Sequence, residues 1–340
     1  MNLHPQPDLS DVGIVVIGRN EGERLRNCLI SLQAWDCPRI YVDSGSSDGS
    51  VALAKSYGYP VLELDTAKPL SAARARNEGL TALRRQAPNI SYVQFIDGDC
   101  TLEAGWLQSA RAYFDDRVAG RDRLAVLCGH LHERHAQSTV FTQLCELEWQ
   151  GPVGVIESCG GISFANIKAL QQVGLFNDMM IAGEEPELCY RLQQQGWTIE
   201  RIDSAMAVHE SDIDKFSQLL RRARRCGHSY AHSHYLHRGA AKAFKQRHLL
   251  SILFWGALLP LAAIVSAPFT GAVSTALLLL YPILWLRIYR RSLRESRIPG
   301  KVAAIHSGLT VVGKFAQLLG VADFYRQLIK KKQFQLIEYK

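Results

Sequence analysis

Short apolar runs alternate with amphipathic stretches through the first 130 residues. The apolar runs predict buried strands at Val12–Ile17, Arg39–Asp43, Val61–Leu64, Tyr92–Ile96 and Leu124–Gly129. Helical periodicity between them predicts helices over Glu23–Gln33, Ser50–Tyr57, Ser71–Arg85 and Ala104–Asp115. This alternation is typical of an α/β fold with a mostly parallel sheet flanked by helices, whose ligands bind at the carboxyl ends of the strands.

A second pattern dominates the later part of the chain. Leu249–Leu286 is a run of 38 residues without a charge, interrupted near Ala267–Gly271. Two helices of about 19 residues, each roughly 28 Å long, fit this run and match a bilayer core. Basic residues on both flanks predict a transmembrane hairpin with both ends in the cytoplasm. The alternative, a buried hairpin in a soluble core, is less favoured because core helices rarely lack a polar face.

The charge distribution divides the chain in the same way. Up to Asp214 there are 18 basic and 29 acidic residues, and from Lys215 onward there are 21 basic and 3 acidic residues. A uniformly basic nucleic-acid binder would not show this division, so no nucleic-acid partner is expected. We predict a catalytic domain over 1–214, a basic amphipathic segment at the surface of membrane lipids over 215–248, two transmembrane helices over 249–289 and a cytoplasmic basic tail over 290–340.

The eight cysteines are scattered without a CxxC pair. This spacing argues against a zinc ribbon and against a disulfide scaffold, and it favours a reducing, cytosolic location for the first domain. The first eleven residues contain no apolar segment of the kind found in signal peptides. We therefore expect a multi-pass protein of the cytoplasmic membrane whose catalytic domain faces the cytoplasm.

Two carboxylates follow the fourth predicted strand, in the sequence Asp97-Gly98-Asp99. Paired carboxylates at a strand end can turn toward one cation, and Mg²⁺ or Mn²⁺ prefers such oxygen ligands, with a diphosphate supplying the rest. An ordinary Asp-Gly turn is the alternative.

Two further polar segments carry candidate chemistry. The loop after the second strand contains Asp43, Ser44 and Asp48 among serines and glycines, as a nucleotide loop would, although Asp48 alone would also suit a helix N-cap. Glu184 and Glu185 stand at the start of a predicted helix over about Pro186–Gln195, just before its first residue, either as complements to the helix dipole or as a general base.

Together these motifs resemble family 2 glycosyltransferases, which invert the anomeric carbon and have a GT-A fold. The resemblance covers about Val12–Arg225. It implies nucleotide contacts in three segments, namely Arg19, Asn20 and Glu21 in the opening loop, Asp43, Ser44 and Asp48 after the second strand, and Arg74, Arg76 and Asn77 on the following helix.

The same resemblance assigns the catalytic residues. It places Asp97 near the ribose, the metal on Asp99 with His209 as a further ligand, and Gly161 in the acceptor-side loop. Glu185 stands where the family usually has the aspartate that acts as base, so both Glu185 and Glu184 remain candidates. The segment Gln218–Arg222 matches the motif of processive synthases incompletely, which favours the addition of one sugar per encounter.

The sequence therefore predicts a metal-dependent glycosyltransferase that moves a sugar from a nucleotide-diphosphate donor to a glycan or lipid-linked acceptor. Cell-surface polysaccharide (exopolysaccharide) or glycolipid synthesis is the expected setting. A nucleotidyltransferase is one alternative, but Gly18–Gly22 lacks the lysine that it would need. A nucleotide-sugar-binding membrane adaptor without turnover is another. A dinucleotide-dependent oxidoreductase is disfavoured because no GxGxxG follows the first strand.

Overall fold

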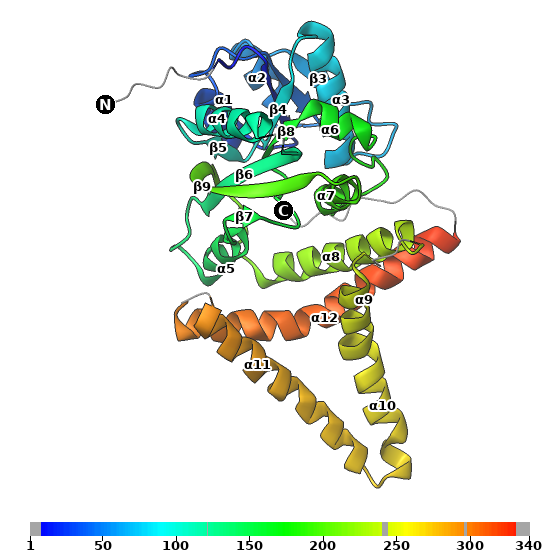
Figure 1. The fold of residues 1–340 in the computed structure, drawn as a ribbon. Coiled ribbons are helices and arrows are strands. Elements are labelled where there is room, and N and C mark those ends of the chain that lie inside the picture. The colour runs from blue at the N-terminus through cyan, green and yellow to red at the C-terminus, as the bar shows by residue number, and fades with distance from the viewer. Residues whose placement is uncertain (1–7, 121, 240–243, 296–297, 331–340) are drawn as a thin grey trace. The chain divides into compact units, whose positions relative to one another are not determined.

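The computed structural model describes residues 8–120, 122–239, 244–295 and 298–330 (Figure 1). Within these residues the chain forms two compact units. The first contains the residues up to Ala136 together with Glu148–Ser211, and the second contains Gln137–Leu147 together with the residues from Asp212 onward. The first seven residues and the last ten residues of the predicted basic tail lie outside the described residues, as do residues 240–243 of the predicted interfacial segment.

The first unit is built on a nine-stranded mixed sheet. The strand order is β3 (Val61–Glu63), β2 (Arg39–Asp43), β1 (Val12–Gly18), β4 (Tyr92–Asp97), β8 (Ser163–Asn166), β6 (Leu124–Glu133), β9 (Thr198–His209) and β5 (Cys100–Leu102), with β7 (Gly154–Val155) also paired to β9. Strands β3, β2, β1 and β4 are mutually parallel, and β6 is parallel to β9. Strand β8 lies antiparallel between these two groups. The predicted α/β class is confirmed.

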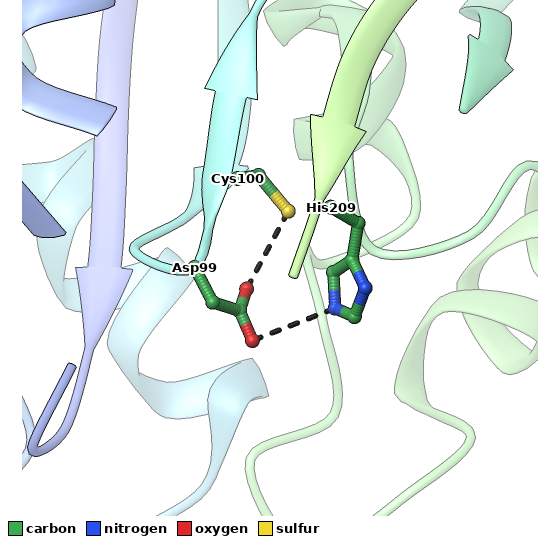
Figure 2. Close-up of side chains that lie close together, drawn as sticks. All are labelled: Asp99, Cys100 and His209. Carbon is green, nitrogen blue, oxygen red and sulfur yellow. Dashed lines mark hydrogen bonds and ion pairs between the residues drawn. The ribbon is translucent and has the colours of Figure 1, made fainter. Parts of the chain in front are cut away.

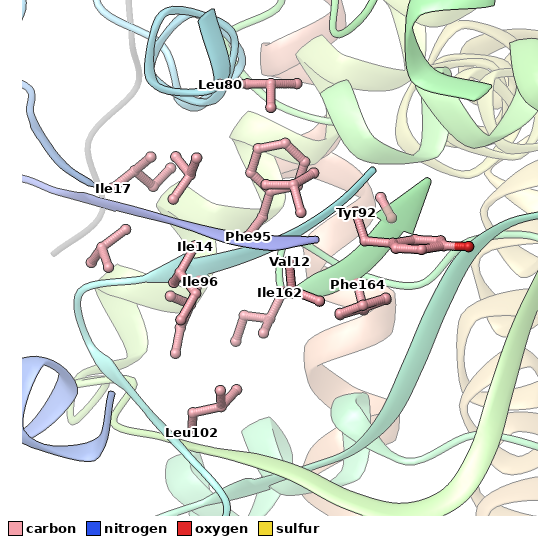
Figure 3. Close-up of a cluster of buried hydrophobic side chains, with 14 of the residues drawn as sticks. Val12, Ile14, Ile17, Leu80, Tyr92, Phe95, Ile96, Leu102, Ile162 and Phe164 are labelled. Atoms are coloured by element: carbon pink, nitrogen blue, oxygen red, sulfur yellow. The ribbon is translucent and has the colours of Figure 1, made fainter. Parts of the chain in front are cut away.

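Helices alternate with the strands, and the sequence predicts all of them except the short helix over Ile167–Gln172. They are α1 (Glu23–Ser31), α2 (Ser50–Ser56), α3 (Ala72–Gln86), α4 (Trp106–Ala119), α6 (Ile167–Gln172) and α7 (Glu184–Gln194). A Cβ added to Gly79 of α3 would lie 2.7 Å from side-chain atoms of both Val15 and Val42, so this glycine lets α3 pack directly on β1 and β2. Strand residues such as Ile14 and Phe95 form the buried core (Figure 3).

The second unit is helical. It contains most of α5 (Val140–Trp149), then α8 (Phe216–Leu236), α9 (Gln246–Leu253), the π-helical turn η1 (Phe254–Leu258), α10 (Leu259–Ser266), the 3₁₀ segments η2 (Ala267–Phe269) and η3 (Val273–Leu279), α11 (Leu280–Glu295) and α12 (Gly300–Ile329). Three continuous helical stretches are long and apolar enough to cross a membrane, namely Gln246–Phe269, Val273–Glu295 and Gly300–Ile329. The first two confirm the predicted helix pair and its turn. The third was not predicted as a span because charges such as Lys314 and Asp323 interrupt it.

Helices α8 and α12 lie side by side and cross at two glycines (Figure 1). A Cβ on Gly227 would lie 2.0 Å from the carbonyl oxygen of Gln317, and one on Gly320 would lie 1.9 Å from that of Arg224. No side chain fits at either crossing point, so the two backbones touch there. Nearby, the Arg224 guanidinium pairs with the Asp323 carboxylate at 2.6 Å.

Candidate active site

The site lies where the strand order of the sheet reverses. The chain runs from β1 outward to β2 and β3 and then returns to place β4 on the other side of β1. In open α/β sheets such a reversal leaves a crevice at the carboxyl ends of the two central strands. Register places Gly18 opposite Asp43 and Ile17 opposite Asp97. The ends of β1, β2 and β4, after which the predicted loops begin, therefore lie beside one another.

The loops after β1 and β2 are bonded together. The Asn20 amide N–H donates to Ser46 Oγ at 2.9 Å, and the Ser47 N–H donates to Asn20 Oδ1 at 2.7 Å. Asp48 accepts from the Gly22 N–H at 3.0 Å. Asn20 has a φ of 56°, a left-handed conformation that asparagine tolerates better than most side chains. Asn20 and Asp48 thus fix the relation of the two loops, while the neighbouring Arg19 is exposed.

Asp43 is buried and already hydrogen-bonded within the chain. Its carboxylate accepts from Tyr41 Oη at 3.0 Å and from the N–H groups of Gly45 and Ser46 at 2.9 and 2.7 Å. The Ser44 N–H donates to the Gly18 carbonyl at 3.0 Å, which closes the crevice floor between β1 and β2. Asp43 therefore shapes the serine-rich loop, and a contact with a nucleoside remains a prediction.

Two predicted contact residues on α3 support neighbouring loops. Arg74 donates to the carbonyl oxygens of Asp65, Lys68 and Pro69, and it pairs with Glu78 at 2.6 Å. Asn77 exchanges hydrogen bonds with the Phe176 backbone and donates to Asp178 Oδ1 at 2.6 Å. These contacts give both residues a structural role that their position in a motif did not reveal.

Arg76, between them, joins two carboxylates from distant parts of the sequence. Its guanidinium donates to Asp97 Oδ1 at 2.7 Å and to Glu184 Oε1 at 2.9 Å, and its side chain is only 2% exposed. A Cβ on Gly161 would lie 2.6 Å from Arg76 Nη2, so the glycine leaves the room that this guanidinium occupies. Asp97, Arg76, Glu184 and Gly161 therefore form one contiguous group, built from four separate motifs of the sequence.

Two residues beyond Asp97, the side chain of Asp99 faces that of His209 (Figure 2). Asp99 Oδ2 lies 3.5 Å from His209 Nε2, and Cys100 Sγ donates to Asp99 Oδ1 at 3.4 Å. Glu21 lies beside this turn, since its Cγ would be 3.3 Å from a Cβ on Gly98. The carboxylate oxygen of Asp99, in the turn between β4 and β5, and the imidazole nitrogen of His209, at the end of β9, form a donor set that suits Mn²⁺ or Mg²⁺. The residues present fit a divalent cation.

Glu133 stands behind His209 and is absent from the sequence prediction. Its carboxylate lies 3.3 Å from His209 Nδ1 and accepts from the Ser211 N–H at 3.1 Å, with the side chain 1% exposed. Burial alone would raise the pKa of Glu133, but the hydrogen bonds with His209 and Ser211 outweigh it and leave that pKa lowered. A charged Glu133 therefore orients the imidazole, with Nε2 turned toward Asp99.

Glu184 and Glu185 occupy different surroundings at the start of α7. Glu184 keeps 13% of its side chain exposed and pairs with Arg76. Glu185 Oε1 accepts from the Cys159 N–H at 2.7 Å and from the thiols of Cys159 and Cys189 at 3.1 and 3.0 Å. Burial raises the pKa of Glu185, although these hydrogen bonds partly offset the shift. The helix begins at Glu184, two residues before the predicted start, so both carboxylates belong to its first turn.

Comparison with known proteins identifies the class that this fold and site define. A model for glycosyl transferase family 2 matches residues 13–163, and one for glycosyl transferase family group 2 matches residues 92–289, more than half of the chain. The protein belongs to the family 2 glycosyltransferases, an enzyme family, which confirms the predicted family and class of enzyme.

Individual relatives agree with this assignment. The pre-mycofactocin glycosyltransferase of Mycobacterium tuberculosis is 26% identical over 233 residues, which cover 65% of this chain and 48% of the relative. The chain thus spans about half the length of the curated relatives it matches. The mannosyltransferase PcManGT from Pyrobaculum calidifontis, solved with GDP-Man and Mn²⁺, matches with a TM-score of 0.60 at 16% identity, over 95% of this chain and 90% of its own.

A second solved structure, TarS 1-349 from S. aureus, matches with a TM-score of 0.52 at 15% identity, covering 90% of this chain and 91% of that structure. Both likenesses concern the fold, and they confirm the predicted GT-A architecture.

Proposed function

We propose that this protein transfers one sugar from a nucleotide-diphosphate donor to an acceptor hydroxyl, with inversion at the anomeric carbon. The observation that carries the proposal is the convergence of Asp99 and His209 with the Asp97–Arg76–Glu184 group at the carboxyl ends of β1 and β4. The nucleotide would occupy the crevice between the loops after β1 and β2, and Asp99 and His209 would hold a Mn²⁺ or Mg²⁺ ion for its diphosphate. PcManGT, which has this fold, was solved with both a nucleotide sugar and Mn²⁺.

The ion supplies positive charge that stabilises the departing nucleoside diphosphate. The protein supplies the remaining chemistry. Arg76 binds Asp97 through Nη2 and Glu184 through Nη1, which links the end of β4 to the first turn of α7. Glu185 accepts the proton of the attacking hydroxyl at a carboxylate oxygen. Its burial favours the protonated form, and a carboxylate of raised pKa is the stronger base.

The ion pair with Arg76 gives Glu184 a different part in this mechanism. Glu184 Oε1 already accepts a hydrogen bond from Arg76 Nη1 at 2.9 Å, so this oxygen is engaged by the guanidinium. Glu184 therefore positions Arg76, and Glu185 acts as the base. This assignment keeps both glutamates in the site and gives each a separate test.

The deciding experiment measures nucleoside diphosphate released from a panel of nucleotide sugars by the full chain in detergent, with Mn²⁺. We expect release that requires the ion and is lost in Asp99→Ala, while the circular dichroism spectrum stays unchanged. Full activity of Asp99→Ala, or binding of nucleotide sugars without any release, would sink the proposal. The second outcome corresponds to the adaptor interpretation.

The membrane arrangement forms the second part of the proposal. We propose that Gln246–Phe269 and Val273–Glu295 cross the cytoplasmic membrane as a hairpin, which brings a lipid-linked or cell-surface glycan acceptor to the cytoplasmic face. Helix α12 has the length of a third span, but its Gly320 face and Asp323 contact the arginine-rich helix α8. We therefore place α12 with α8 on the cytoplasmic side.

A reporter fused after Lys340 tests this topology. A hairpin with cytoplasmic α12 predicts a fluorescent protein that is active there and an alkaline phosphatase that is inactive. The reverse result would mean that α12 crosses the membrane as a third span.

A further inference from the structure

Two buried thiols converge on the same oxygen of Glu185. Cys159 Sγ and Cys189 Sγ lie 3.1 and 3.0 Å from Glu185 Oε1. The two sulfur atoms and a carboxylate oxygen all lie within 4.8 Å of one another. The three residues come from two places in the fold, because Cys159 lies between β7 and β8 while Glu185 and Cys189 lie one turn apart on α7. We refer to these three residues as the cysteine–glutamate cluster.

We propose that the cysteine–glutamate cluster is a binding site for a thiophilic divalent cation of the zinc group. A tetrahedral ion with metal–sulfur bonds of about 2.3 Å and a metal–oxygen bond of about 2.1 Å separates its ligands by roughly 3.5–3.8 Å. The sulfur–oxygen distances of 3.1 and 3.0 Å in the cluster are about half an ångström shorter than this, so small movements of the ligands suffice. The fourth position is left for water, which can approach from the side of Cys159, the most exposed of the three at 8%.

Binding replaces two protons by one ion. The S–H bonds of Cys159 and Cys189 break, both protons leave to solvent, and two metal–sulfur bonds and one metal–oxygen bond form. The three ligands then carry three negative charges against the two positive charges of the ion. The hydrogen bond with Cys189, together with burial, raises the pKa of the Cys159 thiol. The hydrogen bond with Cys159 lowers the pKa of the Cys189 thiol, but burial outweighs it and raises that pKa to about 12. The thiols are therefore protonated until an ion displaces their protons.

The chemistry of this cluster differs from that at Asp99. Thiolates favour zinc-group ions, and the cluster offers two of them, whereas the Asp99 site offers an oxygen and a nitrogen donor with the single thiol of Cys100 nearby. The cluster therefore favours zinc-group ions more strongly than the Asp99 site does. An ion in the cluster occupies the carboxylate that we propose as the base, and this consequence rests on the proposed function. Occupation would stop proton transfer while the donor site keeps its own ion.

Cadmium alone is a suitable probe, because its thiolate complexes absorb in the ultraviolet. The full chain in detergent with a phosphine reductant is titrated with Cd²⁺, and the absorbance and the bound metal are measured. We expect one equivalent of Cd²⁺ with a thiolate-to-metal band in the wild type, and loss of that band in Cys159→Ser and in Cys189→Ser. Cys37→Ser is the matched control, because it removes a buried thiol of the same unit that contacts the Leu9 carbonyl instead.

Turnover provides a second measurement. Cadmium at Asp99 would inhibit the wild type and a Cys159→Ser/Cys189→Ser double variant equally, so a difference between them reports the cluster. We expect the double variant to resist Cd²⁺ concentrations that inhibit the wild type. The proposal is overturned if the wild type shows no thiolate band, or if the band survives in both single variants.

Glu185→Gln provides an independent test in case the serine variants misfold, because it changes the third ligand and keeps both thiols. It should retain the band with weaker affinity, and loss of all cadmium binding in a folded Cys37→Ser control would contradict the assignment. Because the spectrum requires no turnover, the cluster and the transferase proposal can fail independently.

Discussion

Glu133 and Glu185 are both buried in the first unit, yet their surroundings act on them in opposite directions. Glu133 meets an imidazole and a backbone N–H, which keep its pKa low and its carboxylate charged. Glu185 meets two thiols and a backbone N–H, and burial prevails over these weaker donors so that its pKa is raised. The comparison teaches that burial does not assign a role to a carboxylate. The donors that surround it decide whether it serves as a fixed charge or as a base.

The largest expected effect is the loss of turnover on substitution of Glu185. Glu185→Gln removes the proposed base without changing the size of the side chain. General-base removal typically costs 10²–10⁴-fold in rate, so we expect a loss of about that size in nucleoside diphosphate release with acceptor present. Mn²⁺ affinity should stay unchanged. If Glu184→Gln loses as much while Glu185→Gln stays active, the roles of the two glutamates are exchanged.

The next largest effect is expected in the affinity for Mn²⁺. Glu133→Gln leaves His209 without its charged partner, and loss of such a partner typically weakens metal binding by about 10–100-fold. Electron paramagnetic resonance of free Mn²⁺ measures this directly. Glu200→Gln is the matched control, because Glu200 is equally buried but pairs with Arg117 and Tyr113. Equal Mn²⁺ affinity in wild type and Glu133→Gln would show that Glu133 does not position the ligand.

The smallest effect is a shift along the pH axis. A protonated Glu185 cannot accept a proton, so the rate should fall as pH falls through its pKa. This acidic limb should lie above the ordinary range of glutamate because the pKa is raised. The Cys189 thiol lowers that pKa by its hydrogen bond, so Cys189→Ala should move the limb to still higher pH. Cys189→Ser, which keeps a donor, should move it less. If the acidic limb stays at the same pH in Glu185→Asp and in Cys189→Ala, the group that titrates there is not Glu185.

The parts of the site that are close in sequence were predictable from it. Asp97 and Asp99 stand at the end of one apolar strand, so their proximity follows from the strand assignment alone. The alternation of apolar and polar residues also gave the first four strands, because buried parallel strands produce clear apolar runs.

The contacts between distant segments were not predictable in this way. Glu133 was missed because the predicted strand ended at Gly129, whereas β6 continues to Glu133 and pairs it in register with His209. The residues His130–Glu133 alternate as an exposed strand would, and that weak signal was the available one. Cys159 and Cys189 are 30 positions apart, and only the packing of α7 against the loop before β8 joins them. Arg74 and Asn77 also make contacts that motif position did not reveal, because both side chains hydrogen-bond to neighbouring loops. Their contact with a nucleotide stays a prediction.

The glycine crossing of α8 and α12 sets an order of assembly. The chain is synthesised from its N-terminus, so α8 is complete while the hairpin and α12 are still to come. Gly227 then has no backbone to pack against until Gln317 is made, after both helices of the hairpin. Helix α12 can therefore dock on α8 only once the whole hairpin has been synthesised. A ribosome-bound chain that ends before α12 would expose the bare glycine face of α8 to proteases and chaperones.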